Sequence, residues 1–151
     1  MITEVIAVGT ELLLGQTVNT NAARIGARLA DSGVQHNFST VVGDDLGRMV
    51  EAMRLALQRA DVIVITGGIG PTQDDITREA ICEATGRPMR FSDDYADRLR
   101  RWWASRGREM PESNLKQAEY PEGADLLENP KGTAPAVALE HEDVLIFALP
   151  G

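Results

Sequence analysis

The stretch that decides the fold reads Val62-Ile63-Val64-Ile65-Thr66-Gly67-Gly68-Ile69-Gly70-Pro71-Thr72-Gln73-Asp74-Asp75-Ile76-Thr77. Its first four residues form a continuous β-branched run, which is typical of a strand buried on both faces. The segment from Ile76 to Thr85 is amphipathic and predicts a helix. The stretch therefore predicts a strand, a glycine turn and the start of a helix.

The three glycines of this turn, Gly67, Gly68 and Gly70, allow the backbone to approach a ligand closely, because glycine lacks a Cβ and tolerates positive φ. The helix that follows offers free N–H groups and a positive dipole end, which suit phosphate. Asp74 and Asp75 would repel a bare phosphate. They fit a phosphate site if a divalent cation lies between carboxylate and phosphate, since Mg²⁺ prefers hard oxygen ligands.

The same stretch also allows a purely structural interpretation. Thr72 and Asp75 have the spacing of a capping box. Asp74 and Asp75 would also favour the positive end of any helix. Glycines after a strand are common turn residues. The stretch by itself leaves both interpretations open.

The composition is that of an ordinary globular chain of 151 residues, which one domain can accommodate. The net charge of -8 argues against nonspecific nucleic-acid binding, which needs clustered Lys and Arg. The single cysteine, Cys82, rules out an internal disulfide and a cysteine zinc cluster, and we expect it to be a small buried residue. No targeting segment opens the chain and no apolar run could span a bilayer, so we expect a cytoplasmic protein without a membrane partner.

Strands and helices alternate through the first half of the chain. We predict strands at Ile2–Val8 and Val34–Val42 and helices at Asn19–Ala30 and Leu46–Ala60. With the strand that begins at Val62, this alternation predicts a parallel sheet with helices on both faces and right-handed crossovers.

Three predicted turns reach the same edge of that sheet. They are Gly9-Thr10-Glu11, Gly43-Asp44-Asp45 and Thr66-Gly67-Gly68. Ligands of such sheets bind outside the carboxyl ends of the strands. Each turn contains glycine and each contains or closely precedes acidic residues, so the sequence predicts a polar, metal-assisted site at this edge.

The second half begins with a helix that we predict from its cap, Ser92, to about Arg106. Largely irregular chain is predicted for Pro111–Asn129, with a short helical turn at Asn114–Ala118. Two tryptophans of the helix favour a core or subunit contact over a base-stacking platform. Its arginines are either a solvated face or, alternatively, a patch for an anionic substrate; they are Arg98, Arg100, Arg101, Arg106 and Arg108.

The segment Asn129-Pro130-Lys131-Gly132-Thr133-Ala134-Pro135 precedes a predicted hairpin of two strands, Ala136–Leu139 and Val144–Leu149. Lys131 is a basic group among turn residues, which fits a phosphate contact and fits a plain surface turn equally well. A strand followed by Pro150-Gly151 leads us to expect that the chain belongs to a longer protein.

These motifs together resemble the N-terminal domain of the competence/damage-inducible protein A (CinA) family, within the molybdopterin-binding (MoCF-type) domain superfamily. The resemblance covers the whole chain, residues 1–151, as a single domain of this type. It rests on Gly9–Leu13 with Asn19 and Asn21, Val42–Asp45, Thr66–Thr77, and Asn129–Pro135 leading to Leu149–Gly151. Asn114 and Gln117 also fit. The chain departs from the family at Ala136, where glycine is usual, and it does not include the Val-Pro-x-Glu-Met-type segment that follows Leu-Pro-Gly in the family.

The resemblance implies an α/β fold: a three-layer α/β/α sandwich whose sheet is mostly parallel, with an antiparallel hairpin near the C-terminus. It also implies one of two chemistries. CinA-type domains are associated with divalent-metal-dependent ADP-ribose pyrophosphatase activity. The molybdenum-cofactor relatives bind molybdopterin, and some transfer an adenylyl group from ATP; Asp75 and Asp44 stand at their functional positions.

From motif and resemblance together we expect a hydrolase that cleaves ADP-ribose with Mg²⁺, Mn²⁺ or Co²⁺ as cofactor. The expected catalytic residues are Asp75, Asp74 and Asp44, and the expected metal ligands are Asp74, Asp75 and Glu11. The general base is not identified beyond its class, a carboxylate. The expected substrate and phosphate contacts are Gly9, Thr10, Gly67, Gly68, Gly70, Thr72, Asn129, Lys131, Gly132 and Thr133.

Two other functions remain open. One is molybdopterin binding or adenylyl transfer, as in molybdenum-cofactor biosynthesis. The other is a catalytically silent nucleotide-binding module that regulates another domain. In each case the expected partner is a small nucleotide or pterin, with no nucleic acid, and assembly into a homo-oligomer is left open.

Overall fold

The computed structural model describes all 151 residues. Its elements in chain order are β1 (Thr3–Val8), α1 (Thr10–Leu13), α2 (Thr20–Asp31), β2 (His36–Val42), α3 (Leu46–Leu57), β3 (Val62–Thr66), α4 (Thr77–Thr85), β4 (Met89–Phe91), α5 (Asp93–Ala104), the 3₁₀ helix η1 (Glu112–Ala118), β5 (Glu119–Pro121), β6 (Asp125–Leu127), β7 (Ala136–His141) and β8 (Val144–Leu149).

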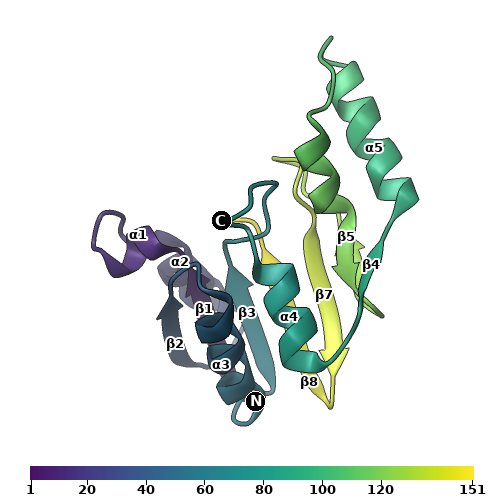
Figure 1. Cartoon of the computed structure of the whole chain (residues 1–151). Helices are drawn as coiled ribbons and strands as arrows, with labels where there is room; N and C mark the ends of the chain where they lie inside the picture. The colour runs from purple at the N-terminus through teal and green to yellow at the C-terminus, as the bar shows by residue number, and fades with distance from the viewer.

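The main sheet has six strands in the order β2-β1-β3-β8-β7-β6 (Figure 1). The strands β2, β1, β3 and β8 pair in parallel, as the strand–helix alternation predicts. β7 pairs antiparallel with both β8 and β6, so the predicted hairpin is confirmed. The sheet is therefore mostly parallel with an antiparallel C-terminal part.

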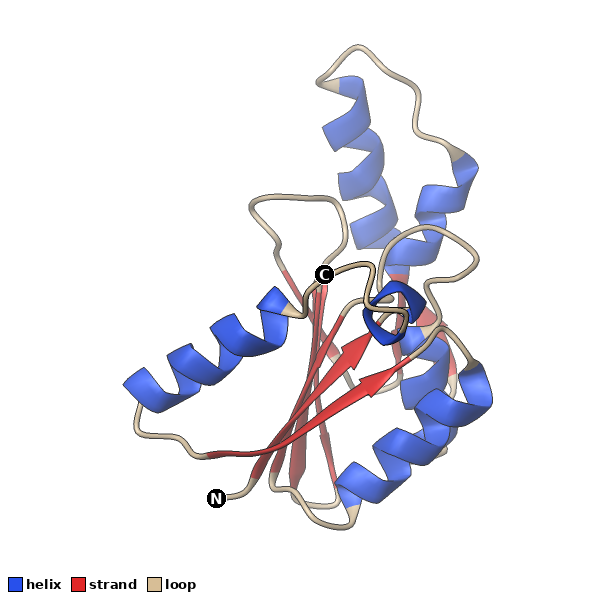
Figure 2. Ribbon diagram, turned by 90° about the vertical axis from the view of Figure 1, so that its left-hand side faces the viewer, coloured by secondary structure: helices blue, strands red, loops and turns tan.

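Helices cover both faces of this sheet, α3 and α4 on one face and α2 on the other (Figure 2). Along β1 the side chains alternate: Ile6 and Val8 belong to the larger core under α3 and α4, and Val5 packs with Ala22 of α2. The exposed fractions of Val5 and Ile6 are both 0%, which explains why the run Val5–Val8 within β1 is apolar without interruption. The predicted three-layer α/β/α sandwich is confirmed.

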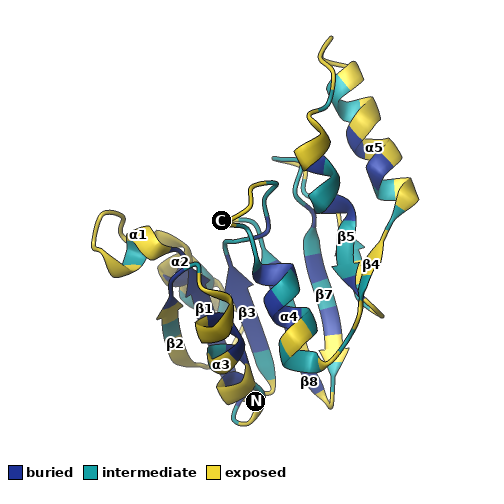
Figure 3. Cartoon of the chain, viewed as in Figure 1, coloured by how far each residue is buried: buried dark blue, intermediate teal, exposed yellow.

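A small lobe projects beyond the sheet, with α5 as its outermost helix (Figure 1). It consists of α5, η1 and the two-stranded sheet β4-β5. Buried residues line β1 and β3, whereas exposed residues predominate on α1 and on much of α5 (Figure 3). Arg100 pairs with Asp97 and Arg98 with Glu128, so the arginines of α5 lie on a solvated face.

Several predicted boundaries were wrong. The segment Pro111–Asn129 is not largely irregular, because it contains β5 and β6 as well as η1. These strands, and β4, are three residues long and are stabilised by partners remote in sequence. No local periodicity could reveal them. α1, with four residues, was missed for the same reason.

Side chains cap three helices, among them the predicted cap Ser92. Asn19, Asp45 and Ser92 accept a hydrogen bond from the backbone N–H three residues ahead, at the starts of α2, α3 and α5. The capping box of Thr72 and Asp75 was wrong, since α4 begins at Thr77 without a side-chain cap. Thr72 and Asp75 instead close a turn ahead of that helix.

Three side chains, Cys82, Trp102 and Trp103, are half-buried, and of these Cys82 differs from its expected surroundings. Cys82 is half-buried rather than buried, with its Sγ 3.8 Å from the Sδ of Met89. The two tryptophan rings of α5 are half-buried and meet edge to face at 5.5 Å between centroids. No helix of the structure combines the length and the apolar character that crossing a membrane requires.

Candidate functional site

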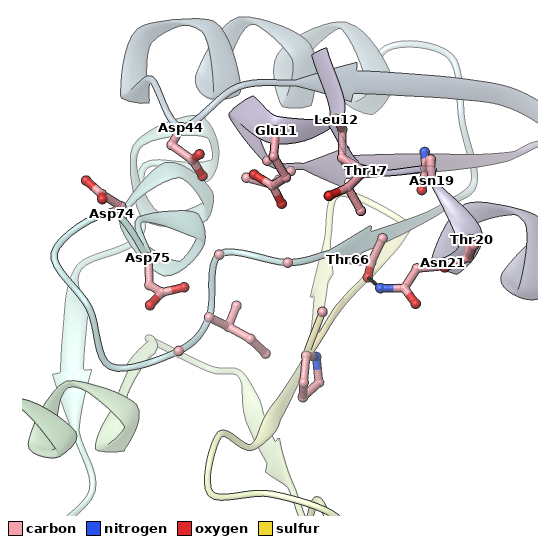
Figure 4. Close-up of a pocket in the computed structure, with 18 of the residues that line it drawn as sticks. Glu11, Leu12, Thr17, Asn19, Thr20, Asn21, Asp44, Thr66, Asp74 and Asp75 are labelled. Carbon is pink, nitrogen blue, oxygen red and sulfur yellow. Dashed lines mark hydrogen bonds between the residues drawn. The ribbon is translucent and has the colours of Figure 1, made fainter. Parts of the chain in front are cut away.

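A cavity of about 670 Å³ opens at the carboxyl ends of β1 and β3, the edge that the sequence predicts (Figure 4). Twenty residues line it. They come from the end of β1 and the chain that follows it, the first turn of α2, the turn after β2, the glycine turn after β3, and the two ends of the hairpin: Val8, Gly9, Glu11, Leu12, Thr17, Val18, Asn19, Thr20, Asn21, Asp44, Thr66, Gly67, Gly68, Ile69, Gly70, Asp74, Asp75, Ala134, Pro150 and Gly151.

The glycine turn forms one wall of the cavity, and the structure leaves no room for a side chain at Gly67 or Gly68. Gly67 and Gly68 have φ of 97° and 68°, in the region that favours glycine. A Cβ on Gly67 would lie 2.5 Å from the carbonyl oxygen of Val8, and one on Gly68 would lie 2.3 Å from Oγ1 of Thr77. Thr77 donates its hydroxyl to Gly67 O and its N–H to Gly68 O, both at 2.9 Å. The turn is therefore fixed to the first residue of α4.

Two carboxylates of the cavity are held in place by threonines. Oδ2 of Asp44 accepts hydrogen bonds from the N–H and hydroxyl of Thr10 at 3.0 and 2.9 Å. Oδ2 of Asp75 accepts the corresponding pair from Thr72 at 2.8 and 2.6 Å. In each case the second carboxylate oxygen, Oδ1, makes no such bond and stays available for a ligand.

The other two carboxylates, Glu11 and Asp74, accept no hydrogen bond from the protein. Glu11 lies against Gly9, where a Cβ would come within 2.6 Å of its Oε1. The backbone of Gly9 thus makes room for this carboxylate. The expected metal ligands Glu11, Asp74 and Asp75 therefore all face one cavity, together with Asp44 (Figure 4).

No Lys, Arg or His is among the lining residues, so four carboxylates face the cavity without a protein cation. An anionic ligand would be repelled from such a surface unless a cation entered with it. Carboxylate oxygens are ligands that Mg²⁺ and Mn²⁺ accept. The donor chemistry therefore fits a divalent metal ion.

The geometry does not provide a complete metal cage, because no group of three or more His, Cys, Asp or Glu side chains is clustered closely enough to hold an ion. Mg²⁺ is usually bound by one or two carboxylates together with the phosphates of its substrate. The fixed carboxylates of Asp44 and Asp75 suit that mode, in which the ligand would supply the remaining oxygens.

The segment Asn129–Thr133, expected to contact phosphate, does not line this cavity. Asn129, Gly132 and Thr133 instead border a separate hollow of about 140 Å³ against α5. The Tyr95 hydroxyl donates to the Thr133 carbonyl at 3.0 Å, which ties the segment to the small lobe. Only Ala134, just beyond it, reaches the cavity.

Thr10 and Thr72, also expected to contact the ligand, do not line the cavity. They contribute to it through Asp44 and Asp75, whose carboxylates they hold in place.

Sequence reasoning missed the polar residues that line the side of the cavity nearest α2. They are Thr17, Asn19, Thr20, Asn21 and Thr66. The sequence indicated Asn19 and Asn21 only through the family resemblance. The available signal is their position at the start of α2, after the chain that leaves the carboxyl end of β1.

A buried arginine lies behind the glycine turn. Arg78 of α4 has an exposed fraction of 0% and donates to the carbonyl oxygen of Ile69. Its Nε and Nη1 have no partner in the protein. Burial lowers the pKa of its guanidinium, and the charge of Glu79 counteracts this only in part. Arg78 therefore braces the turn from inside the protein.

Comparison with known proteins agrees with this geometry. The family described as "Probable molybdopterin binding domain" matches residues 4–151. The chain belongs to this molybdopterin-binding (MoCF-type) family. Within it, the chain corresponds to the N-terminal domain of the CinA proteins. It is 48% identical over 153 residues to a CinA-like protein of Frankia casuarinae, and the alignment covers 98% of this chain.

Solved structures include a CinA protein and a more distant chain that shares the fold. The protein CinA of Thermoplasma acidophilum, of unknown function, is 38% identical, with a TM-score of 0.91 over 99% of this chain and 88% of that chain. The molybdopterin biosynthesis enzyme MoaB of Thermus thermophilus is 22% identical, with a TM-score of 0.64 over 99% of this chain and 80% of that chain, and shares the fold. This chain spans only 35% of the Frankia protein and 37% of a Caldicellulosiruptor saccharolyticus relative.

Proposed function

We propose that this domain hydrolyses the diphosphate of ADP-ribose to AMP and ribose 5-phosphate in the presence of a divalent metal ion. One observation carries the proposal: four carboxylates and a glycine turn share a cavity that no basic side chain lines. Such a cavity favours a phosphate ligand that arrives with its own divalent cation. A diphosphate can chelate such a cation through oxygens of both its phosphates, and it presents a bond to cleave.

Each group of residues has a distinct role in this proposal. The backbone of Gly67 and Gly68 would lie against the diphosphate, because the missing Cβ atoms let this turn pack closely on Val8 and Thr77 and form the cavity wall. Asp44 and Asp75, whose orientations are fixed by Thr10 and Thr72, would be the residues that hold the metal ion. When bound, the ion would neutralise phosphate charge and lower the pKa of a bound water.

In the hydrolytic step, the oxygen of a water molecule forms a bond to one phosphorus and the bond from that phosphorus to the bridging oxygen breaks. The bridging oxygen leaves with the electron pair on the other phosphate. The proton of the water passes to a carboxylate, for which Glu11 and Asp74 are available because neither accepts a hydrogen bond from the protein.

The experiment is an assay of AMP release from ADP-ribose with Mg²⁺, Mn²⁺ or Co²⁺, with a chelator as control. Asp75→Asn removes one carboxylate of the cavity, and Asp31→Asn changes an exposed aspartate at the end of α2 as a matched control. We expect release that needs metal, survives in Asp31→Asn and is lost in Asp75→Asn.

A second candidate function is molybdopterin binding, with or without adenylyl transfer. The family to which the chain belongs favours it. Thermal shift distinguishes the two, because a ligand stabilises the native state in proportion to RT ln(1 + [L]/Kd). Stabilisation by molybdopterin without AMP release from ADP-ribose would replace the first function by the second.

A further inference from the structure

The cavity is chemically divided into two ends (Figure 4). Asp44, Asp74 and Asp75 lie at one side of the view, and the amides and hydroxyls near α2 lie at the other. The second group, called here the neutral end, consists of Thr17, Val18, Asn19, Thr20, Asn21 and Thr66. None of these six side chains carries a charge, so the neutral end does not share the requirement for a cation.

The neutral end has unused hydrogen-bonding groups. Asn21 donates one N–H to Oγ1 of Thr66 at 3.3 Å, which leaves its amide oxygen and second N–H available. Asn19 uses its amide oxygen to cap α2 through Ala22 N–H at 3.1 Å, which leaves its NH₂ group available. An amide presents a donor and an acceptor side by side. This pattern matches a heterocycle edge that has an acceptor next to a donor, as in adenine.

An apolar side chain stands beside these amides. Val18 lines the neutral end and yet has an exposed fraction of 79%. A solvated valine next to two asparagines offers a surface for the face of a flat ring, while the amides serve its edge. Phosphate would use the hydroxyls and amides but would gain nothing from Val18.

We propose that the neutral end binds the heterocycle of the ligand, with its edge on Asn21 and its face on Val18. The placement of the remainder of the ligand rests on the proposed function, which puts the diphosphate at the acidic end. The chemistry required is a planar ring with adjacent hydrogen-bond donor and acceptor. A purine and a pterin both have it.

Calorimetric titration of Asn21→Leu tests this proposal with two probes, ADP and inorganic pyrophosphate, each with excess Mg²⁺. The variant keeps the Asn19 cap of α2 and removes only the amide. We expect ADP to bind about tenfold more weakly to the variant than to the wild type, since one bidentate base contact contributes about that much. Pyrophosphate should bind unchanged. Ala23→Leu, at an exposed position of α2 outside the cavity lining, is the matched control.

The outcomes separate this proposal from the proposed function. An equal loss for both probes, or an unchanged ADP affinity, contradicts the heterocycle site. Failure of pyrophosphate to bind the wild type contradicts the diphosphate site, whereas a loss confined to ADP in Asn21→Leu would still support the heterocycle site.

Competition then identifies the ring. Displacement of ADP by adenosine assigns the neutral end to a purine, and displacement by 6-hydroxymethylpterin assigns it to a pterin. Displacement by neither contradicts the proposal.

Discussion

Thr10 and Asp44 lie 34 residues apart and hold each other through three hydrogen bonds. The Thr10 N–H and hydroxyl donate to Oδ2 of Asp44, and the Asp44 N–H donates back to the Thr10 hydroxyl at 3.1 Å. The turns after β1 and β2 are thereby locked together, and one carboxylate is fixed at the cavity. Thr72 fixes Asp75 in a similar way within a single turn.

Replacing Thr10 tests that lock. Thr10→Val removes both hydroxyl bonds and should lower the free energy of unfolding by about 1–3 kcal/mol, at about 1 kcal/mol for each bond. It should also weaken metal-dependent binding of pyrophosphate, because Asp44 loses its fixed orientation. Urea denaturation and calorimetry measure the two effects. Thr10→Ser keeps the hydroxyl and should restore most of both, and a serine variant as impaired as the valine variant would contradict the role of the hydroxyl.

The glycine turn should tolerate no side chain. Gly68→Ala places a Cβ 2.3 Å from the hydroxyl of Thr77 at a φ of 68°, so we expect a loss of about 2 kcal/mol or more in the free energy of unfolding. Gly47→Ala is the control, since Gly47 is exposed within α3 with no atom closer than 3.6 Å to the added Cβ. Gly47→Ala should raise the free energy of unfolding by about 1 kcal/mol, because alanine favours a helix over glycine by about that amount. Equal effects at both positions would show that the turn is not constrained as the structure indicates.

Replacing Arg78 should affect the stability of the fold and the affinity of the cavity for pyrophosphate differently. Its desolvated charge has no ion-pair partner, so Arg78→Met relieves a cost while leaving the Ile69 carbonyl unpaired. Since burial lowers its folded-state pKa, this cost is present at every pH below that pKa and is relieved only as pH rises toward the unfolded-state pKa. We expect the free energy of unfolding to change by less than about 2 kcal/mol, and pyrophosphate affinity to fall as the turn loosens.

Urea denaturation measures the free energy of unfolding of Arg78→Met, and calorimetric titration measures its affinity for pyrophosphate. Arg54→Met, on the exposed surface of α3, is the control. A loss of about 4 kcal/mol, the size seen when a buried ion pair is broken, would mean that the guanidinium stabilises the fold directly.

Cys82 should react slowly with alkylating agents. Burial, followed by the charges of Glu79 and Glu119, raises the pKa of its thiol above the ordinary value. Because the thiolate is the reactive form, the alkylation rate at neutral pH should be lower than that of a free thiol such as glutathione. The rate should rise with pH to a midpoint above that of glutathione. A rate equal to that of glutathione at neutral pH would contradict the predicted environment.

The sequence predicted those parts of the fold and site that depend on local pattern. The run Val62–Ile65, the glycines after it and the aspartates beyond them identified the sheet, the edge at which the cavity opens and the acidic end of that cavity. Asp44 was found because parallel strands bring their carboxyl ends together.

What depended on contacts remote in sequence could not be predicted in this way. The composition of Asn129–Thr133 fits a phosphate contact and a plain surface turn equally well. The structure places the segment outside the cavity lining, with the Tyr95 hydroxyl of α5 donating to the Thr133 carbonyl. The neutral end was missed because Asn21 meets Thr66 across 45 residues, and only the folded chain shows them at one cavity.

The most direct test of the account is the rate of AMP release from ADP-ribose by this chain and by Asp75→Asn, with Mg²⁺ or Mn²⁺ and with chelator. We expect release that requires metal and that falls by about 100-fold or more in the variant, because changing a residue that only supports a metal ligand already costs about 10- to 100-fold. Urea denaturation should confirm that the variant is folded. Metal-dependent release that is unchanged in Asp75→Asn, or no release by the wild type with any metal, would contradict the account.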